Sequence, residues 1–169
     1  MFKRFYPDEY YNSTYSIPYE KLYEAGYRGI IYDIDNTLVP HGAPADDKSK
    51  VLFARLKDIG FDCVLLSNNK QPRVDMFNEE INVHTVSKAG KPKKEGYIKA
   101  CNLMGTGTDN TLFIGDQIFT DVWGAKRVGI HSIMVKYIDP HEEIQIVIKR
   151  KLEKIVLREY LKNHKMLGE

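Results

Sequence analysis

Short apolar runs alternate along the chain with longer stretches in which apolar residues recur every three or four positions. Unbroken apolar runs of this length are typical of strands covered on both faces, and the longer period is that of helices. Strands alternating with helices predict an α/β fold, a three-layer sandwich with a mostly parallel central sheet and right-handed crossovers. The predicted strands cover residues 28–34, 61–66, 83–86, 111–114 and 131–135, and the helices between them cover residues 46–59, 72–77, 92–104 and 120–128.

The helix boundaries rest on particular residues. The helix over residues 46–59 has acids in its first turn and Gly60 after its last, which are start and stop signals. Pro92 is expected in the first turn of a later helix, where its missing N–H costs nothing. Thr120 is expected to cap the helix that Gly129 ends.

A tyrosine-rich segment precedes the core of residues 28–135. Residues 1–27 contain seven tyrosines, interrupted by Pro7 and Pro18. We expect them to form a flap packed on the domain, and a position at lipid head groups is the alternative. The length and apolar content of residues 1–169 suit one buried core, so a single domain is expected.

The C-terminal segment, residues 141–165, is predicted to be a basic amphipathic helix running from Glu142 to His164. Such a helix usually packs on its own domain, and this is the expectation here. The alternative is that it lies on an anionic membrane surface. The apolar stripe consists of Ile144, Ile148, Leu152, Ile155 and Val156.

Charge and composition exclude several classes of protein. The net charge of +2 arises in residues 141–169, which is too small an excess to indicate nucleic-acid binding, so no nucleic-acid partner is expected. No apolar run is long enough to span a bilayer, and the first residues lack a signal-peptide pattern. A cytoplasmic location is expected, with peripheral contact at the inner face of the membrane left open. Cys63 and Cys101 are expected to be buried free thiols.

The strongest chemical signal is a pair of acids at the end of the first strand. Asp33 and Asp35 are two positions apart, and side chains with this spacing in an extended segment project the same way. Alone, the pair is equally compatible with a sugar-transferase metal site or with surface acids. A calcium loop is excluded because Leu38 and Pro44 stand where its turn glycine and its glutamate are needed. The chain also lacks a complete dinucleotide fingerprint and a P-loop.

Further polar features follow in order along the chain. They are Ser67-Asn68, Lys91-Pro92, and Gly115-Asp116 with Asp121. Together with Asp33-Ile34-Asp35-Asn36-Thr37, they resemble the haloacid dehalogenase (HAD) superfamily of phosphohydrolases over residues 28–135. The residues of these motifs also resemble those of the YqeG-like group of subfamily IIIA. This resemblance extends over nearly the whole chain. That group includes relatives of phosphatidylglycerophosphate phosphatases.

The resemblance implies roles in phosphoryl transfer. Asp33 would be the nucleophile that forms an aspartyl-phosphate. Asp35 would protonate the leaving group and then activate water. Ser67, the Asn68 backbone and Lys91 would bind the phosphoryl oxygens.

The resemblance also implies Mg²⁺ as the cofactor. Asp33, Asp116 and the backbone carbonyl of Asp35 would hold the ion, which prefers oxygen ligands in an octahedral arrangement. Asp121 would support the site by orienting water or the catalytic lysine. For Thr37, support of the loop and simple stabilisation of a turn stay equally open.

The spacing of the motifs leaves no room for an inserted cap domain. Asp33 and Ser67 are 34 positions apart, and Ser67 and Lys91 are 24 apart. By resemblance, members without caps have open sites and act on large or surface-bound substrates, or borrow a lid from a second copy in a homo-oligomer. His41 follows the first motif and receives no role, since loop histidines are usually solvated.

The expected activity is Mg²⁺-dependent hydrolysis of a phosphorylated substrate. Phosphatidylglycerophosphate is the preferred candidate by resemblance, which makes a phospholipid head group the expected partner. A soluble phosphatase for a sugar phosphate, nucleotide or nucleic-acid end remains an alternative, and so does a non-catalytic HAD-fold binding protein.

Four basic residues flank the motifs and are expected to be ordinary surface charge: Lys70, Arg73, Lys93 and Lys94.

Overall fold

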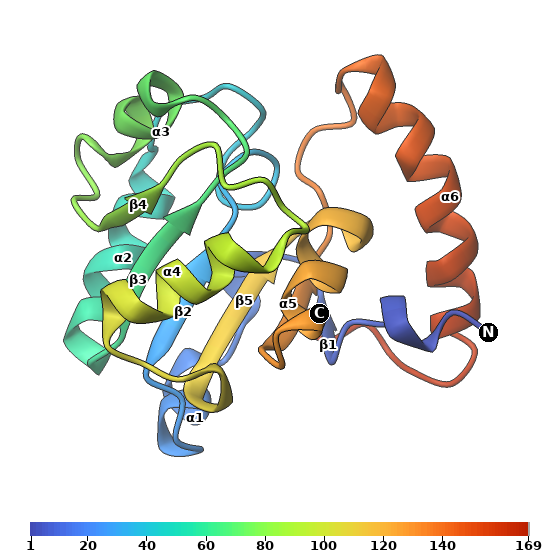
Figure 1. The fold of residues 1–169 in the computed structure, drawn as a ribbon, viewed down its shortest axis with the longest axis horizontal. Coiled ribbons are helices and arrows are strands. Elements are labelled where there is room, and N and C mark those ends of the chain that lie inside the picture. Colours follow the sequence, from blue (N-terminus) through green and yellow to red (C-terminus); the bar gives the residue numbers. More distant parts are fainter. Residues whose placement is uncertain (169) are drawn as a thin grey trace.

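The computed structural model describes residues 1–168 and is built on one six-stranded sheet (Figure 1). All neighbouring strands are parallel, in the order β1-β6-β5-β2-β3-β4. The prediction of an α/β fold with a parallel central sheet is therefore confirmed. The strands are β1 (Glu9–Tyr11), β2 (Gly29–Tyr32), β3 (Asp62–Leu66), β4 (His84–Val86), β5 (Thr111–Gly115) and β6 (His131–Val135).

Helices cover both faces of the sheet (Figure 1). Helices α1 (Tyr19–Glu24), α2 (Asp47–Ile59) and α3 (Gln71–Asn78) share one buried cluster with β2 and β3. Helices α4 (Lys94–Met104) and α5 (Trp123–Arg127) pack on the opposite face. The last helix, α6 (Ile144–Tyr160), stands beyond the β1 edge. Short helical turns cover Lys3–Phe5 (η1), Thr14–Ser16 (η2), Thr108–Asn110 (η3) and Ile118–Val122 (η4).

Alternation along β2 explains why this strand is apolar throughout. Ile30 and Tyr32 enter the cluster with α2, whereas Ile31 enters the cluster with α4. Successive side chains in a strand point to opposite faces, and both faces are covered here. All three side chains are fully buried.

The carboxyl ends of the inner strands meet at one edge of the sheet. Tyr32, the last residue of β2, lies opposite Leu65 of β3 and Ile114 of β5. From β2 the sheet continues through β3 and β4 on one side and through β5 and β6 on the other. Parallel sheets bind ligands beyond the strand ends at the point where the order diverges in this way.

The N-terminal segment contributes a strand that the sequence pattern did not predict. Strand β1 pairs with β6, and Glu9 lies opposite Ile133. Tyr10 and Tyr11 are buried, so this part of the expected flap belongs to the sheet itself. A strand of three residues is too short to show a period, and its pairing depends on a partner far away in the sequence.

Two expected helix starts are wrong. Helix α4 begins at Lys94, so Pro92 precedes the helix and does not lie in its first turn. Thr120 lies inside η4, and the capping position before this turn is Gln117, so Thr120 does not cap a helix. Instead, the side chain of Asp121 accepts hydrogen bonds from the backbone N–H groups of Asp116 and Gln117 and so stabilises this turn. A normal N-cap residue precedes the N–H groups that it binds, whereas Asp121 follows them.

The C-terminal helix has a different buried face from the one expected. The helix packs on its own domain, as expected, but of the predicted apolar stripe only Val156 is buried. The helix instead buries Arg150, Glu153, Val156 and Tyr160. Charged side chains occupy this face because they bind groups at the strand ends.

Cys63 and Cys101 are buried and free, as predicted. Among the described residues, no helix combines the length and the apolar character needed to cross a bilayer.

Candidate active site

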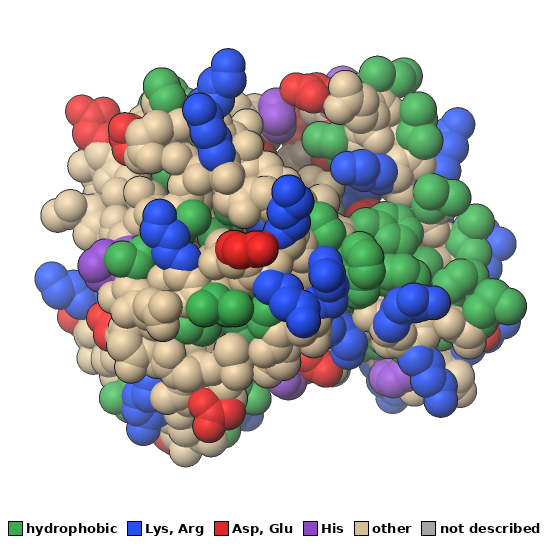
Figure 2. Space-filling view, in the orientation of Figure 1, with side chains coloured by type: hydrophobic (Ala, Val, Ile, Leu, Met, Phe, Trp, Pro, Cys, Tyr) green, Lys and Arg blue, Asp and Glu red, His purple; other side chains and the backbone are tan. Residues whose placement is uncertain are grey.

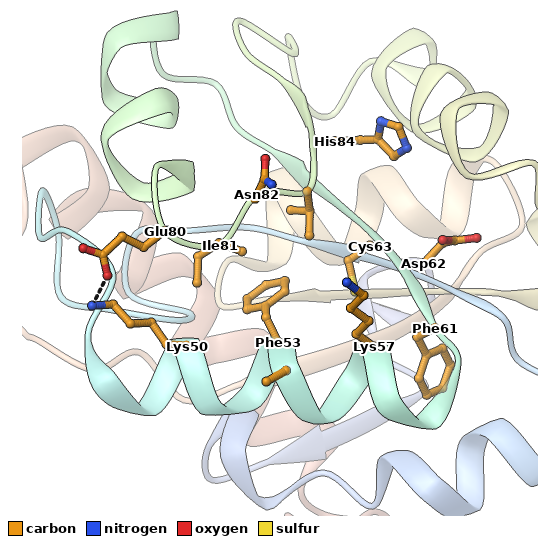
Figure 3. Close-up of a pocket in the computed structure, with 12 residues that line it drawn as sticks. Lys50, Phe53, Lys57, Phe61, Asp62, Cys63, Glu80, Ile81, Asn82 and His84 are labelled. Atoms are coloured by element: carbon orange, nitrogen blue, oxygen red, sulfur yellow. Dashed lines mark ion pairs between the residues drawn. The ribbon is translucent and has the colours of Figure 1, made fainter.

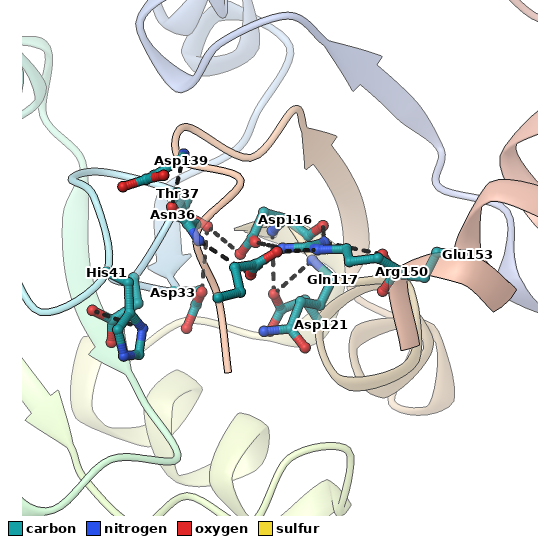
Figure 4. A network of polar contacts seen from close by, with 12 residues as sticks. Asp33, Asn36, Thr37, His41, Asp116, Gln117, Asp121, Asp139, Arg150 and Glu153 are labelled. Carbon is teal, nitrogen blue, oxygen red and sulfur yellow. Dashed lines mark hydrogen bonds and ion pairs between the residues drawn. The ribbon is translucent and has the colours of Figure 1, made fainter. Parts of the chain in front are cut away.

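Polar side chains from several loops collect where the inner strands end (Figure 4). Asp33 follows β2, Ser67 follows β3 and Asp116 follows β5, while Lys91 comes from the loop before α4. All four residues are buried. The strand ends thus place these predicted residues at one edge of the sheet.

Lys91 joins two carboxylates in the centre of this group. Its Nζ donates to Asp33 Oδ1 at 2.9 Å and to Asp121 Oδ1 at 2.7 Å. Burial opposes the charge on Lys91, but the carboxylates of Asp121 and Asp33 outweigh this effect and raise its pKa. Lys91 therefore presents a permanent positive charge beside Asp33.

The loop after β3 holds the backbone of Lys91. Asn68 Oδ1 accepts from the Lys91 N–H at 2.7 Å, and Asn68 Nδ2 donates to the Lys91 carbonyl at 3.2 Å. Ser67 Oγ accepts from the Asn69 N–H at 3.0 Å, so its hydroxyl hydrogen is available to a ligand. The structure adds a positioning role for the Asn68 side chain, while its predicted backbone contact with phosphate stays a prediction.

Thr37 and Asp121 fix the position of Asp116. The Thr37 hydroxyl lies 2.9 Å from Asp116 Oδ1 and 3.3 Å from Asp33 Oδ2. Asp121 Oδ2 accepts from the N–H groups of Asp116 and Gln117 at 3.2 and 3.1 Å. Thr37 thus contacts both Asp33 and Asp116, and Asp121 connects the turn at Asp116 and Gln117 to Lys91.

Three of the acids form a group suited to a cation. Asp33, Asp116 and Asp121 each offer a carboxylate oxygen, and these atoms lie within 4.8 Å of one another. Hard oxygen ligands so close together fit a divalent ion such as Mg²⁺. Asp121, expected only to support the site, lies in this group, whereas the Asp35 side chain does not. Coordination by the Asp35 carbonyl stays a prediction.

The pKa values of these acids respond to their burial. Burial raises the pKa of Asp33 to about 7, against the opposing charge of Lys91 and with a contribution from Asp116. Burial likewise raises the pKa values of Asp116 and Asp121, while Arg150 and Lys91 oppose the rise. The group therefore accepts positive charge, from protons or from a cation, near neutral pH.

Asp35 faces a different set of partners. Its Oδ1 accepts from Arg73 Nη2 at 2.8 Å and from the Gly42 N–H at 2.7 Å, and its Oδ2 accepts from Asn69 Nδ2 at 2.7 Å. The side chain of Arg73 is only 15 % exposed, so it is not the ordinary surface charge that we expected. His41 Nδ1 lies 3.9 Å from the same carboxylate, and its side chain is 39 % exposed.

Arg73 also has an unused donor. Its Nη1 is buried and, within residues 1–168, is the buried side-chain polar atom that lacks a hydrogen-bond partner. A buried donor without a partner is costly, and a bound ligand is one explanation for it.

Arg150 of α6 reaches Asp116 and was missed by sequence reasoning (Figure 4). Its Nη2 lies 2.5 Å from Asp116 Oδ2, and its Nη1 donates to the Asp116 carbonyl at 2.8 Å. Glu142 accepts from Arg150 Nε at 2.8 Å, and Glu153 accepts from Nη1 at 3.0 Å. The only signal in the sequence was a charged pair three residues apart outside the apolar stripe.

Asn36 ties the loop after β2 to the segment that leads to α6. Its φ of 62° lies in the left-handed region, which asparagine tolerates better than most residues. The Asn36 carbonyl and Oδ1 accept the N–H groups of Ile138 and Asp139 at 3.2 and 3.0 Å. Its Nδ2 donates to Glu142 Oε2 at 3.1 Å. The start of α6 and the loop that bears Asp33 and Asp35 are therefore held together.

A hollow of about 590 Å³ lies away from these residues, between α2 and the first residues of β3 and β4 (Figure 3). Phe53 and Lys57 line it from α2, with Cys63 and His84 from the strands, and Lys50 pairs with Glu80 at its side. None of its lining residues belongs to the group at the strand ends. We therefore place no chemistry there.

A family model described as haloacid dehalogenase-like hydrolase matches residues 41–129. This match contains Ser67, Lys91, Asp116 and Asp121, and it begins after the two acids of the first motif. The chain is 34 % identical over 159 residues to the Bacillus subtilis (strain 168) protein named Probable phosphatase YqeG, which covers 93 % of this chain and 92 % of that protein.

Two more distant relatives differ in the substrates that their names give. Phosphatidylglycerophosphate phosphatase 1, chloroplastic/mitochondrial, of Arabidopsis thaliana is 23 % identical over 163 residues, which cover 86 % of this chain and 45 % of that protein. Glyceraldehyde 3-phosphate phosphatase of Pyrococcus abyssi is 25 % identical over 97 residues, which cover 52 % of this chain and 40 % of that protein. This chain matches less than half the length of either relative.

Solved structures share the fold. An uncharacterized protein from Listeria monocytogenes serotype 4b superposes with a TM-score of 0.55 at 14 % identity and covers 78 % of this chain and 99 % of its own. A HAD phosphatase from Thermococcus onnurineus superposes with a TM-score of 0.53 at 12 % identity and covers 76 % of this chain and 97 % of its own. At such identities the likeness shows the fold alone.

Proposed function

This chain belongs to the haloacid dehalogenase-like hydrolase family, and on that premise we propose that it is a Mg²⁺-dependent phosphatase that hydrolyses phosphatidylglycerophosphate. The products would be phosphatidylglycerol and inorganic phosphate. The observation that carries the proposal is the buried group of Asp33, Lys91 and Asp116 at the strand ends. This group suits any phosphomonoester, so the choice of substrate depends on the residues around it.

The first step would transfer the phosphoryl group to Asp33. A carboxylate oxygen of Asp33 bonds to phosphorus while the bond from phosphorus to the ester oxygen breaks. Lys91, 2.9 Å from that carboxylate, and the Ser67 hydroxyl stabilise the charge on the phosphoryl oxygens. The leaving alkoxide takes its proton from Asp35.

The second step would regenerate the enzyme. Asp35 accepts a proton from water, the water oxygen bonds to phosphorus, and the bond from Asp33 to phosphorus breaks to release inorganic phosphate. A Mg²⁺ ion held by Asp33, Asp116 and the Asp35 carbonyl would supply positive charge beside the phosphoryl oxygens. Asp121 keeps Lys91 and Asp116 in place throughout.

Arg73 supports a substrate with a second anionic group. Phosphatidylglycerophosphate carries a phosphodiester next to its terminal phosphate, and a guanidinium binds such oxygens through paired N–H donors. Arg73 already has one buried donor without a partner among the described residues. Binding of the diester to Arg73 would also remove the Arg73 hydrogen bond from Asp35 Oδ1, which would keep the bond from the Gly42 N–H and gain room for the leaving group.

The connections around the site support a bulky substrate. The connection from β2 to α2 spans residues 33–46 and contains no helix or strand of its own, and the stretch from Ser67 to Lys91 contains only α3 and β4. No added domain covers the strand ends in the described chain. A lipid whose acyl chains stay in a membrane can reach a site of this kind.

A soluble phosphomonoester is the second candidate substrate. The similarity to the Pyrococcus glyceraldehyde 3-phosphate phosphatase favours it, although the match covers only 52 % of this chain. Such a substrate has no diester for Arg73. The two candidates therefore make different demands on this residue.

Asp33→Asn tests the reaction itself. We expect the substitution to lower Mg²⁺-dependent hydrolysis of an aryl phosphate by about 10⁴-fold or more, because the amide is a poor nucleophile. Asp58→Asn, an exposed change on α2, is the matched control and should leave the rate unchanged. Asp35→Asn should trap phosphoenzyme, detectable after acid quenching. Normal activity in Asp33→Asn would contradict the mechanism, and an inactive wild type would favour a binding protein.

Arg73→Gln tests the substrate. Phosphate release is measured with phosphatidylglycerophosphate in mixed micelles and, separately, with glyceraldehyde 3-phosphate and an aryl phosphate. We expect the wild type to prefer the lipid, and Arg73→Gln to lower kcat/KM for the lipid by about 10- to 100-fold while affecting the aryl phosphate much less. Lys70→Gln, at an exposed position three residues earlier, is the control. A wild type that prefers a soluble ester removes the lipid assignment.

A further inference from the structure

The outward face of α6 carries a continuous apolar stripe. Ile144, Ile148, Leu152 and Ile155 follow one another at helical spacing, with exposed fractions of 73 %, 57 %, 53 % and 55 %. Scattered exposed apolar residues are normal on a protein surface, but four on one helix face form a patch that favours contact with another surface. We call these four residues the α6 stripe.

The α6 stripe cannot turn inward without breaking the buried face of the same helix. Arg150 binds Asp116 and Glu142 from that face, and Glu153 accepts the Ile118 N–H at 2.8 Å. Tyr160 packs there in a cluster with Tyr10 and Met134. Rotation of the helix would expose these contacts and bury charged groups without partners. The outward direction of the stripe is thus set by the structure.

Basic side chains flank the α6 stripe. Helix α6 has four exposed basic residues. Of its two acids, Glu153 is buried in an ion pair, so only Glu159 can offset this positive charge at the surface. In the space-filling view, green apolar side chains run along the outer side of α6 with blue basic ones beside them (Figure 2). The four exposed basic residues are Lys149, Lys151, Lys154 and Arg158.

We propose that α6 docks on an anionic lipid membrane, with the α6 stripe in the acyl boundary and the flanking basic residues at the head groups. A helix with an apolar face and flanking lysines lies in the interface in this way, through buried apolar area and attraction to anionic lipids. The positive charge beside the α6 stripe favours an anionic membrane over a second copy of this chain as the partner. A second copy of this chain would bring two rows of like charges together across the paired stripes, which disfavours association.

The docking surface is independent of the identity of the substrate. It rests on the exposure and charge of α6 and not on the reaction at the strand ends. If the protein hydrolyses phosphatidylglycerophosphate, the same contact also brings the site to its substrate. Vesicles for the test therefore contain phosphatidylserine, whose head group is neither the proposed substrate nor its product.

The experiment measures binding of the full chain to vesicles by co-sedimentation. We expect binding to vesicles of phosphatidylcholine with about 30 % phosphatidylserine, weakened strongly by 0.5 M salt, and little binding to pure phosphatidylcholine. I148Q/L152Q should lower the affinity for the anionic vesicles about tenfold or more, and K151Q/K154Q/R158Q by a similar factor. Both variants should hydrolyse an aryl phosphate at the wild-type rate, since neither changes the site.

Matched controls carry equal changes on other helices. V51Q/I98Q replaces exposed apolar residues on α2 and α4, and K57Q/K94Q/K99Q replaces exposed lysines on the same two helices. Neither should change vesicle binding. Equal losses in the controls and in the α6 variants would overturn the proposal, because they would show a general effect of surface polarity.

The oligomeric state tests the other possibility, that a second copy of this chain covers the α6 stripe. We expect sedimentation velocity to give the same mass for the wild type and for I148Q/L152Q. A wild-type dimer that the substitution converts to a monomer, with no vesicle binding by the wild type, would show that a second copy covers the α6 stripe. Absence of binding to anionic vesicles by a folded, monomeric wild type would also overturn the proposal.

Discussion

The buried charges at the strand ends do not balance. Lys91 and Arg150 are the two cations of this group, and Arg150 binds Asp116 and both of its glutamate partners. With every acid ionised, five carboxylates face two cations, an excess of three negative charges. A divalent cation would remove most of this excess, which is the physical reason to expect one. The five acids are Asp33, Asp116, Asp121, Glu142 and Glu153.

Gly115 is the residue that admits Asp121 to the group. A Cβ at this position would lie 2.5 Å from Asp121 Oδ2, which is buried, so the Asp121 side chain or the backbone would have to shift. We expect Gly115→Ala to displace Asp121, release Lys91, and lower aryl phosphate hydrolysis by about 100-fold while the protein stays folded. The rate and the circular dichroism spectrum are the measurements.

Gly107→Ala is the matched control for this change. A Cβ there would lie 2.6 Å from Asp109 Oδ1, which is also too close, but the acid is the end of a side chain in an exposed turn and can move aside. Its activity should equal that of the wild type. Equal activity in both glycine variants would show that the position of Asp121 does not matter.

Sequence reasoning placed the strand-end residues but not their partners. Asp33, Ser67 and Asp116 follow apolar runs directly, and such runs in a parallel sheet end at one edge. Arg150 and Arg73 lie on helices, and their contacts depend on how each helix is rotated and where it stands. No local pattern in a single sequence contains that information.

Arg150 makes the charged attachment of helix α6 to the strand ends, beside the packing of Val156 and Tyr160. We expect Arg150→Met to lower the free energy of unfolding by about 3–5 kcal/mol, because it leaves buried carboxylates without a partner. Arg55→Met, which removes an exposed ion pair with Glu20, should cost about 1 kcal/mol or less. Urea denaturation measures both, and similar losses in the two variants would contradict a structural role for the Arg150 contacts.

The elements themselves were predicted unevenly. Strands β2, β3 and β5 and helix α2 agree with the pattern to within a few residues, because their apolar residues face the core. Helix α6 was also predicted, but its buried face was not, since an apolar stripe does not show which face of a helix packs on the domain. Strand β1 was missed because three residues carry no period.

Metal and protons compete for the same acids, and this competition should affect the stability of the entire protein. The Asp33 pKa rises from 3.8 to about 7 on folding, so the folded state of the metal-free protein holds the extra proton between these values. The contribution of this proton to stability is fully present below about pH 3.8 and is lost as the pH rises to about 7. Mg²⁺ should raise the Tm by roughly 5 °C or more at pH 8 and by much less at pH 5.5.

The matched variants for this measurement are Asp116→Asn and Asp58→Asn. The first removes a carboxylate from the cation group and should abolish the Mg²⁺-dependent rise in Tm. The second lies on the exposed surface of α2 and should retain it. A rise in Tm that is the same at both pH values would show that Mg²⁺ binds away from these acids.

The double attachment of α6, through Arg150 to Asp116 and through Asn36 to the loop after β2, has a thermodynamic consequence. Two ligands that bind one protein must change each other's affinity by the same factor, whichever binds first. If engagement of α6 shifts Arg150 or Asn36, it changes the cation affinity of Asp116, and the cation then changes the affinity of α6 for its contact by the same factor. A change in cation affinity on engagement of α6 would therefore measure this coupling.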